Sequence, residues 1–129
     1  MQPTLEPVPT ILTVDDCTIT QKVIKQVFGK DYRVLGASNA MEALITIYQE
    51  SIDILVLDVS MPDIDGLELC RTVRKLPRFE EIPIVMLTSR DRPFDKVQGL
   101  RAGATEYLTK PVDVERLRQV VTRFLSKSH

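Results

Sequence analysis

Short apolar runs alternate with stretches of helical periodicity along most of this chain, and no other feature limits the fold as strongly. The apolar runs predict β-strands at residues 10–14, 32–36, 52–59, 82–87 and 105–108. The patterns between them predict helices at residues 18–28, 39–49, 67–76, 93–102 and 113–125. Strands that alternate with helices form a parallel sheet covered on both faces. We therefore predict an α/β fold, a five-stranded parallel doubly wound sheet of the flavodoxin-like type (strand order 2-1-3-4-5) with five helices.

Local signals support these elements. The unbroken apolar run at residues 54–57 is typical of a strand that is buried on both faces. Gly29 and Gly103 follow two of the helical patterns, and Pro93 stands in the first turn of another. The helical spacing predicts these buried side chains: Ile19, Val23, Ile24, Val27 and Phe28 in the first helix; Ala40, Leu44, Ile47 and Tyr48 in the second; Val114, Leu117, Val120, Val121 and Leu125 in the last.

The length and composition indicate one globular domain. With 129 residues, we expect a loose leader at residues 1–9, a folded domain at 10–126 and a short tail at 127–129 that ends in His129. A net charge of −1 gives no overall basic field for nucleic acid, and no apolar run is long enough to cross a membrane. Cys17 and Cys70 have no metal-type spacing, so a reducing cytoplasmic setting is expected.

Polar side chains follow the ends of four predicted strands. Asp15 and Asp16 follow the first strand, and Asp58 lies near the end of the third. Thr88 and Ser89 follow the fourth strand, and Lys110 follows the fifth. Ligands of open α/β sheets bind outside the carboxyl ends of the strands, so these residues are expected to share one edge.

The residue types at this edge predict a phosphoryl site. Crowded carboxylates repel one another unless a counter-ion is present, and Mg²⁺ prefers oxygen ligands. A cation, a lysine and a hydroxyl around one carboxylate would stabilise a transferring phosphoryl group. Asp58 would itself be the nucleophile and form an aspartyl phosphate.

Taken singly, each of these residues has an ordinary structural interpretation. Asp15 and Asp16 are typical of a helix N-terminus, and Asp58 is typical of a turn. Thr88 could be a strand-end hydroxyl, and Lys110 could belong to a surface turn. Their joint placement at one sheet edge favours the phosphoryl site over this set of separate explanations.

Four segments carry a resemblance to a known family. They are residues 13–16 (TVDD), 56–66 (VLDVSMPDIDG), 85–89 (VMLTS) and 102–111 (AGATEYLTKP). From about residue 9 to 125 the chain resembles the receiver domain of two-component response regulators, close to stand-alone CheY-like receivers. The resemblance implies that Asp58 accepts a phosphoryl group from the phosphohistidine of a sensor histidine kinase or phosphotransfer protein. It implies Mg²⁺ bound directly by Asp16 and Asp58, through water by Asp15, and by the backbone carbonyl of Ser60.

The same resemblance implies a switch. Lys110 would contact the phosphoryl oxygens, Thr88 would move toward them, and Tyr107 would turn inward into the space that Thr88 leaves. The surface formed by the fourth helix, fifth strand and last helix would then bind a downstream effector protein. Without the family, Tyr107 is interpreted as a half-buried strand aromatic. The Lys110–Pro111 bond is expected to be cis.

Two basic features stand beside this core prediction. Arg90 lies two residues after Thr88, and we hypothesise that it screens the phosphate and slows its hydrolysis; solvated loop charge is the alternative. Arg116, Arg118 and Arg123 in the last helix would be either a partner surface or a solvated face.

Other functions predict other residues. A flavin-binding protein of this fold would carry a glycine- and hydroxyl-rich loop after the first strand, where Asp15 and Asp16 stand. An aspartate-nucleophile phosphatase would place its nucleophile after the first strand, usually in an Asp-x-Asp arrangement, and would carry a substrate-covering insertion; the sequence has neither after its first predicted strand. A receiver-like module that binds without phosphorylation would typically lack one of the site residues. We expect no enzyme beyond catalysis of its own phosphorylation and dephosphorylation. Since the chain ends four residues after Leu125, we expect signalling by contact or a receiver taken from a larger protein.

Overall fold

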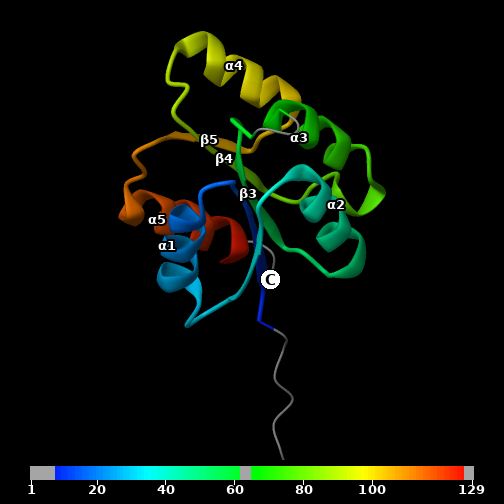
Figure 1. Ribbon diagram of the computed structural model, residues 1–129, viewed down its shortest axis with the longest axis vertical. Helices are drawn as coiled ribbons and strands as arrows, with labels where there is room; N and C mark the ends of the chain where they lie inside the picture. The colour runs from blue at the N-terminus through cyan, green and yellow to red at the C-terminus, as the bar shows by residue number, and fades with distance from the viewer. Residues whose placement is uncertain (1–7, 62–64, 127–129) are drawn as a thin grey trace, which may run out of the picture.

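The computed structural model describes residues 8–61 and 65–126 (Figure 1). Most of the predicted leader, residues 62–64 and the tail with His129 lie outside the described residues. Within the described residues, no helix has both the length and the apolar character that a bilayer crossing requires.

The centre of the fold is a 5-stranded sheet in the order β2-β1-β3-β4-β5, with parallel pairing throughout. The strands are β1 (Thr10–Val14), β2 (Arg33–Ala37), β3 (Ile54–Asp58), β4 (Ile84–Thr88) and β5 (Glu106–Thr109). The predicted fold class and strand order are therefore confirmed. The sheet is parallel because a helix follows each of its strands along the chain and returns it to the same edge.

The helices are α1 (Thr18–Phe28), α2 (Ala40–Gln49), α3 (Gly66–Arg74), α4 (Pro93–Ala102) and α5 (Val114–Ser126). Figure 1 shows α1 and α5 together on one face of the sheet and α2 and α3 on the other. A short 3₁₀ turn, η1 (Pro77–Phe79), follows α3 and was not predicted from the sequence.

The alternation of side chains along each strand divides the core into two clusters. In β3, Ile54 and Val56 pack toward α1 and α5, whereas Leu55 and Leu57 pack in the cluster with residues of α2 and α3. Both pairs are at most 1% exposed. The unbroken apolar run in β3 is explained by this burial on both faces.

Polar side chains and glycine fix several helix ends. Asn39 accepts a hydrogen bond from the backbone N–H of Glu42 at 2.8 Å and so caps the start of α2. Gly103 ends α4 with a φ of 118°, in the left-handed region that favours glycine. Gly29 also ends its helix, although its backbone is right-handed there.

The observed boundaries differ from the predicted ones by one to two residues at several ends. β3 is Ile54–Asp58 instead of residues 52–59, and α3 is Gly66–Arg74 instead of residues 67–76. Interstrand pairing decides where a strand ends, and Ile52 and Val59 lie beyond the paired register although both are buried. Helix and strand ends are the least determined part of a sequence pattern.

Two predicted core residues were assigned wrongly. Tyr48 of α2 is 88% exposed and Ile19 of α1 is 72% exposed. Each lies at the margin of a broad apolar arc, and only part of that arc contacts the sheet. In α5, Leu117, Val120, Val121 and Leu125 are buried as predicted, while Val114 is only partly buried.

Candidate functional site

The carboxyl ends of β1, β3, β4 and β5 lie side by side at one edge of the sheet. Val14 pairs with Leu57, and Asp58 pairs with Leu87, so Asp15 and Asp58 leave neighbouring strands at the same height. Thr88 pairs with Thr109, which places Lys110 beside the end of β4. The predicted convergence of these residues is confirmed by the structure.

Asp15, Asp16 and Asp58 form one acidic cluster, in which an oxygen from each carboxylate lies within 4.8 Å of the others. Asp15 and Asp58 are buried, with 2% and 5% exposure, whereas Asp16 is exposed. The backbone N–H of Cys17 donates to Asp15 Oδ1 at 2.9 Å. The backbone N–H of Ser60 donates to Asp58 Oδ1 at 3.2 Å, so the chain after each strand turns back onto the carboxylate.

Lys110 supplies the positive charge of the site. Its ammonium donates to Asp15 Oδ2 at 2.9 Å and lies 3.7 Å from Asp58 Oδ2. The Lys110–Pro111 peptide bond is cis, as expected. Lys110 therefore bridges the two buried carboxylates from the far end of the sheet edge.

The electrostatics of Asp58 and Lys110 reflect this crowding. Burial raises the pKa of the Asp58 carboxyl, and the negative charge of Asp15 adds to this, against the Ser60 N–H and Lys110. For Lys110, burial alone would lower the pKa, but the hydrogen bond to Asp15 and the attraction of both carboxylates raise it. The charged form of Asp58 thus has too little compensation within the chain.

A divalent cation fits this set of donors. The cluster offers three carboxylate groups and Lys110 offers one ammonium, which leaves a formal charge of −2 at the site. The groups that could bind a cation here are the carboxylate oxygens of Asp15, Asp16 and Asp58, and Mg²⁺ prefers hard oxygen ligands. The acidic cluster is therefore consistent with Mg²⁺.

Thr88 and Tyr107 lie next to this cluster on the α2–α3 side of the sheet. Thr88 is fully buried, and its Oγ1 accepts a hydrogen bond from the backbone N–H of Arg90 at 3.1 Å. Tyr107 is 6% exposed, and its hydroxyl donates to the backbone carbonyl of Arg90 at 2.8 Å. Tyr107 is therefore buried beside β4 while Thr88 is also buried, and the movement of the two residues stays a prediction.

Gly99 of α4 was not singled out from the sequence, yet it makes room for this position of Tyr107. A Cβ at Gly99 would lie 2.6 Å from Tyr107 Cδ2, closer than a real side-chain carbon approaches. The two residues are close only after α4 has packed beside β5, so no local sequence pattern joins them.

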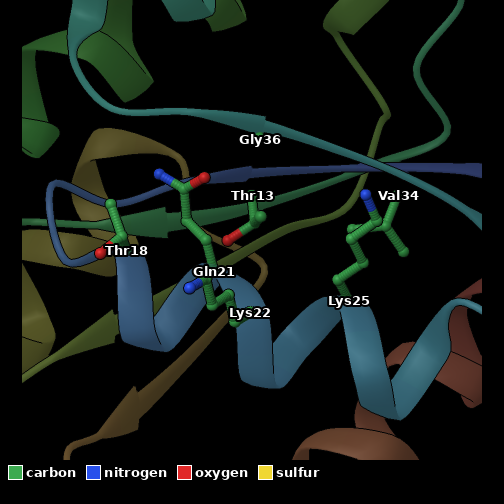
Figure 2. A pocket seen from close by; sticks show the side chains of 7 residues that line it. All are labelled: Thr13, Thr18, Gln21, Lys22, Lys25, Val34 and Gly36. Carbon is green, nitrogen blue, oxygen red and sulfur yellow. The ribbon is translucent and has the colours of Figure 1, made fainter.

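Gln21 of α1 is a second residue that the sequence reasoning missed. Its side chain lines a cavity of about 320 Å³ between α1 and β2, together with Thr13, Lys22 and Lys25 (Figure 2). Its amide nitrogen donates to the backbone carbonyl of Asp15 at 2.6 Å. A single glutamine on a helix gives no sequence signal for such a contact.

Comparison with known proteins places the chain among receiver domains. A sequence model of the response regulator receiver domain matches residues 11–122. An uncharacterised 14.6 kDa protein of Leptolyngbya boryana is 39% identical over 115 residues, which cover 88% of each chain. Response regulator MprA of Mycobacterium leprae is 38% identical over 119 residues, which cover 92% of this chain and 51% of that protein.

The chain also matches part of a much longer protein. Histidine kinase P4 of Formosa agariphila is 36% identical over 116 residues, which cover 90% of this chain and 8% of the kinase. The chain thus spans about half of MprA and a small part of the kinase.

Solved structures agree with the sequence matches. The receiver domain of Francisella response regulator 1452 superposes with a TM-score of 0.86 at 30% identity, covering 94% of this chain and 99% of that one. The chemotaxis protein CheY4 of Vibrio cholerae also gives a TM-score of 0.86 at 30% identity, with 91% and 98% covered.

Proposed function

Because this chain belongs to the response regulator receiver family, we propose that it is a phosphoacceptor switch of two-component signalling in which Asp58 takes the phosphoryl group. The observation that carries this proposal is the convergence of Asp58 with Asp15, Asp16 and Lys110 at one sheet edge. The excess negative charge of the cluster and the near-complete burial of Asp58 support a site that is completed by a cation and a phosphoryl group.

Each residue of the site has a role in this proposal. An Asp58 carboxylate oxygen attacks the phosphorus of a phosphohistidine; the new P–O bond forms as the P–N bond breaks, and its electron pair leaves with the imidazole. Asp16, Asp58 and the Ser60 carbonyl would hold Mg²⁺ directly, and Asp15 would hold it through water. When bound, Mg²⁺ supplies positive charge for the phosphoryl oxygens.

Lys110 and the cluster around it set the charge balance of the transfer. The Lys110 ammonium is already within reach of Asp58, so it would move only a short distance to contact a phosphoryl oxygen. Its hydrogen bond to Asp15 holds it at the site before transfer. The transfer is the chain's own modification, so we propose no activity toward an external phosphate ester.

Thr88 and Tyr107 would convert the new charge into a change of shape. A phosphoryl group adds roughly −1.5 to −2 charge and strong acceptor oxygens. The Thr88 hydroxyl would donate to one of these oxygens, and its hydrogen bond with the Arg90 N–H would then rearrange. Since the Arg90 carbonyl also accepts from Tyr107, the loop after β4 would carry this change to Tyr107 and α4.

The partners follow from this role. The phosphoryl donor would be a sensor histidine kinase or a phosphotransfer protein, and the output a protein that binds the α4-β5-α5 face. Phe94, Val97 and Leu100 leave large exposed apolar surface on α4, which supports a protein partner there rather than nucleic acid. We place this activity in the cytoplasm and in the domain at residues 10–126.

A phosphoryl-transfer assay with a small acyl phosphate donor and Mg²⁺ tests the proposal. Wild-type protein is expected to become labelled, while Asp58→Asn, which keeps the shape of the side chain, is expected to remain unlabelled. Equal labelling of both proteins would overturn the assignment of Asp58. A wild-type protein that takes no label but still binds an effector would favour a phosphorylation-independent binding module.

A further inference from the structure

Asp15 is held at each of its polar atoms. Its backbone N–H donates to the carbonyl of Ala37 at 3.0 Å, and its carboxylate accepts from the Cys17 N–H and the Lys110 ammonium, each at 2.9 Å. The remaining atom, the backbone carbonyl oxygen, accepts from Gln21 Nε2 at 2.6 Å. Gln21 is therefore the contact that fixes the peptide plane between Asp15 and Asp16.

The Gln21 amide also joins the ends of two strands. Its nitrogen lies 3.1 Å from the carbonyl oxygen of Ala37 and 3.3 Å from Ser38 Oγ, at the end of β2. Figure 2 shows the side chain reaching from α1 to the strands that carry Thr13 and Gly36. One neutral side chain thus ties α1 to the ends of both β1 and β2.

Gly36 provides the space for this arrangement. A Cβ at Gly36 would lie 2.3 Å from Gln21 Oε1 and 3.3 Å from Gln21 Cδ. Glycine within a strand ordinarily weakens it, and one recognised reason for its presence is a close approach by another group. The amide of Gln21 is that group here.

The orientation of Asp16 depends on the same peptide plane. Within the described residues, the Asp16 carboxylate makes no hydrogen bond or ion pair of its own, and the side chain is exposed. The atoms of the Asp15 carbonyl and the Asp16 N–H are coplanar, so fixing the carbonyl also fixes the direction in which Asp16 leaves the chain. The aim of Asp16 toward the cluster therefore rests on its backbone.

We propose that Gln21 is a positioning residue of the phosphoryl site and that it holds the Asp15–Asp16 segment in the conformation needed for cation binding. Gly36 leaves the space that the Gln21 amide occupies. This inference rests on the proposed function, because it assigns the segment to a Mg²⁺ site. Groups that orient metal ligands without touching the metal typically change metal affinity when they are removed.

The test compares the Mg²⁺ affinity of Gln21→Met with that of wild type, by titration followed through backbone amide shifts or by calorimetry. Methionine keeps a similar length but offers no N–H donor. We expect the dissociation constant to rise roughly tenfold. Phosphorylation by the acyl phosphate should slow at low Mg²⁺ and recover at saturating Mg²⁺, because the nucleophile and Lys110 are untouched.

Lys22→Met is the matched control, since Lys22 is the next residue of α1 and lines the same cavity, and within the described residues it makes no hydrogen bond or ion pair with Asp15. It should leave the Mg²⁺ affinity within about twofold of wild type. Gly36→Ala provides a second variant, which is expected to lower the Mg²⁺ affinity as well, because the added Cβ displaces the Gln21 amide. A folded Gln21→Met protein with wild-type Mg²⁺ affinity would overturn the positioning role.

The two proposals fail in different ways. If wild type binds Mg²⁺ but takes no phosphoryl group, the proposed function fails and the titration still decides the role of Gln21. If wild type is phosphorylated and Gln21→Met matches it in Mg²⁺ affinity and at every Mg²⁺ concentration, only the role of Gln21 fails.

Discussion

The two edges of the sheet both hold partly or fully buried charges, but among residues 8–61 and 65–126 the charges are fully paired at only one edge. At the amino-terminal edge, the guanidinium of Arg74 donates to the carbonyls of Gly103 at 2.9 Å, Phe79 at 2.8 Å and Ile82 at 2.6 Å, and to Thr105 Oγ1 at 3.2 Å. Burial lowers the pKa of Arg74, yet its donors are met by oxygens from the segments that lead into β4 and β5.

The carboxyl-terminal edge shows the opposite balance. There, Lys110 pairs with Asp15 and Asp58, Asp16 makes no ion pair within the described residues, and burial raises the pKa of Asp58. Buried charge therefore has a different role at each edge. At the amino-terminal edge a buried cation joins loops through hydrogen bonds, whereas the carboxyl-terminal edge keeps excess negative charge that a bound cation would neutralise.

Removing the satisfied charge should have the largest effect on stability. Arg74→Met retains most of the aliphatic stem but leaves the carbonyls before β4 and β5 without their donors. We expect the free energy of unfolding to fall by about 2–3 kcal/mol, the upper part of the range for a single hydrogen bond to a charged group. Urea unfolding measures this loss, and Mg²⁺ affinity should be unchanged.

Arg71→Met is the matched control on the same helix. Arg71 is exposed and pairs with Glu68 at the surface, 2.7 Å away, so its removal should change stability by less than about 0.5 kcal/mol. Equal losses for the two variants would mean that the contacts of Arg74 contribute no more than a surface ion pair.

The same contrast explains what the sequence could predict. Apolar runs specify the strands because both faces of β1, β3 and β4 are buried, and their ends then place Asp15, Asp58 and Thr88 at one edge. The acidic edge was therefore visible in the sequence: residues that follow strands share an edge in any parallel sheet.

The rest depends on contacts between distant segments. In the sequence, Arg74 looks like an ordinary charged residue near a helix end. Its contact with Gly103, 29 residues away, forms only when the chain folds. Gln21 and Gly36 likewise become partners when α1 packs on β2. The apolar arc of α2 extends to Tyr48, but the sheet covers only part of that arc, and periodicity does not reveal which part.

Removing the unsatisfied charge should have a smaller effect, and in the opposite direction. Because the folded environment raises the pKa of Asp58, its charged form opposes folding at neutral pH. In the presence of a chelator, Asp58→Asn should therefore be more stable than wild type, by less than the loss expected for Arg74→Met. Asparagine keeps an oxygen for the Ser60 N–H.

Mg²⁺ should reverse this order. Wild type gains stability with Mg²⁺ by mass action, about 2.7 kcal/mol when the ion is at 100 times its dissociation constant, and Asp58→Asn should gain less. Unfolding measured with chelator and with Mg²⁺ gives both differences. A metal-free Asp58→Asn protein that is less stable than wild type would contradict the claim that the negative charge of Asp58 destabilises the fold.

The smallest effect is expected at the rim of the acidic edge, where Arg90 lies 3.7 Å from Asp65 in a half-exposed ion pair. The backbone of Arg90 holds Thr88 and Tyr107, and both contacts survive in Arg90→Ala. This variant therefore isolates the guanidinium, which we expect to screen the phosphate.

In Arg90→Ala, phosphate loss should be roughly two- to fivefold faster than in wild type, a barrier change of about 1 kcal/mol or less. Arg92→Ala is the control, because the Arg92 side chain pairs with Asp95 of α4 and, within the described residues, makes no hydrogen bond or ion pair with Asp15, Asp58, Thr88 or Lys110. Slower loss in Arg90→Ala than in wild type would show that the guanidinium does not shield the phosphate, and the loop charge would then belong to the solvated surface.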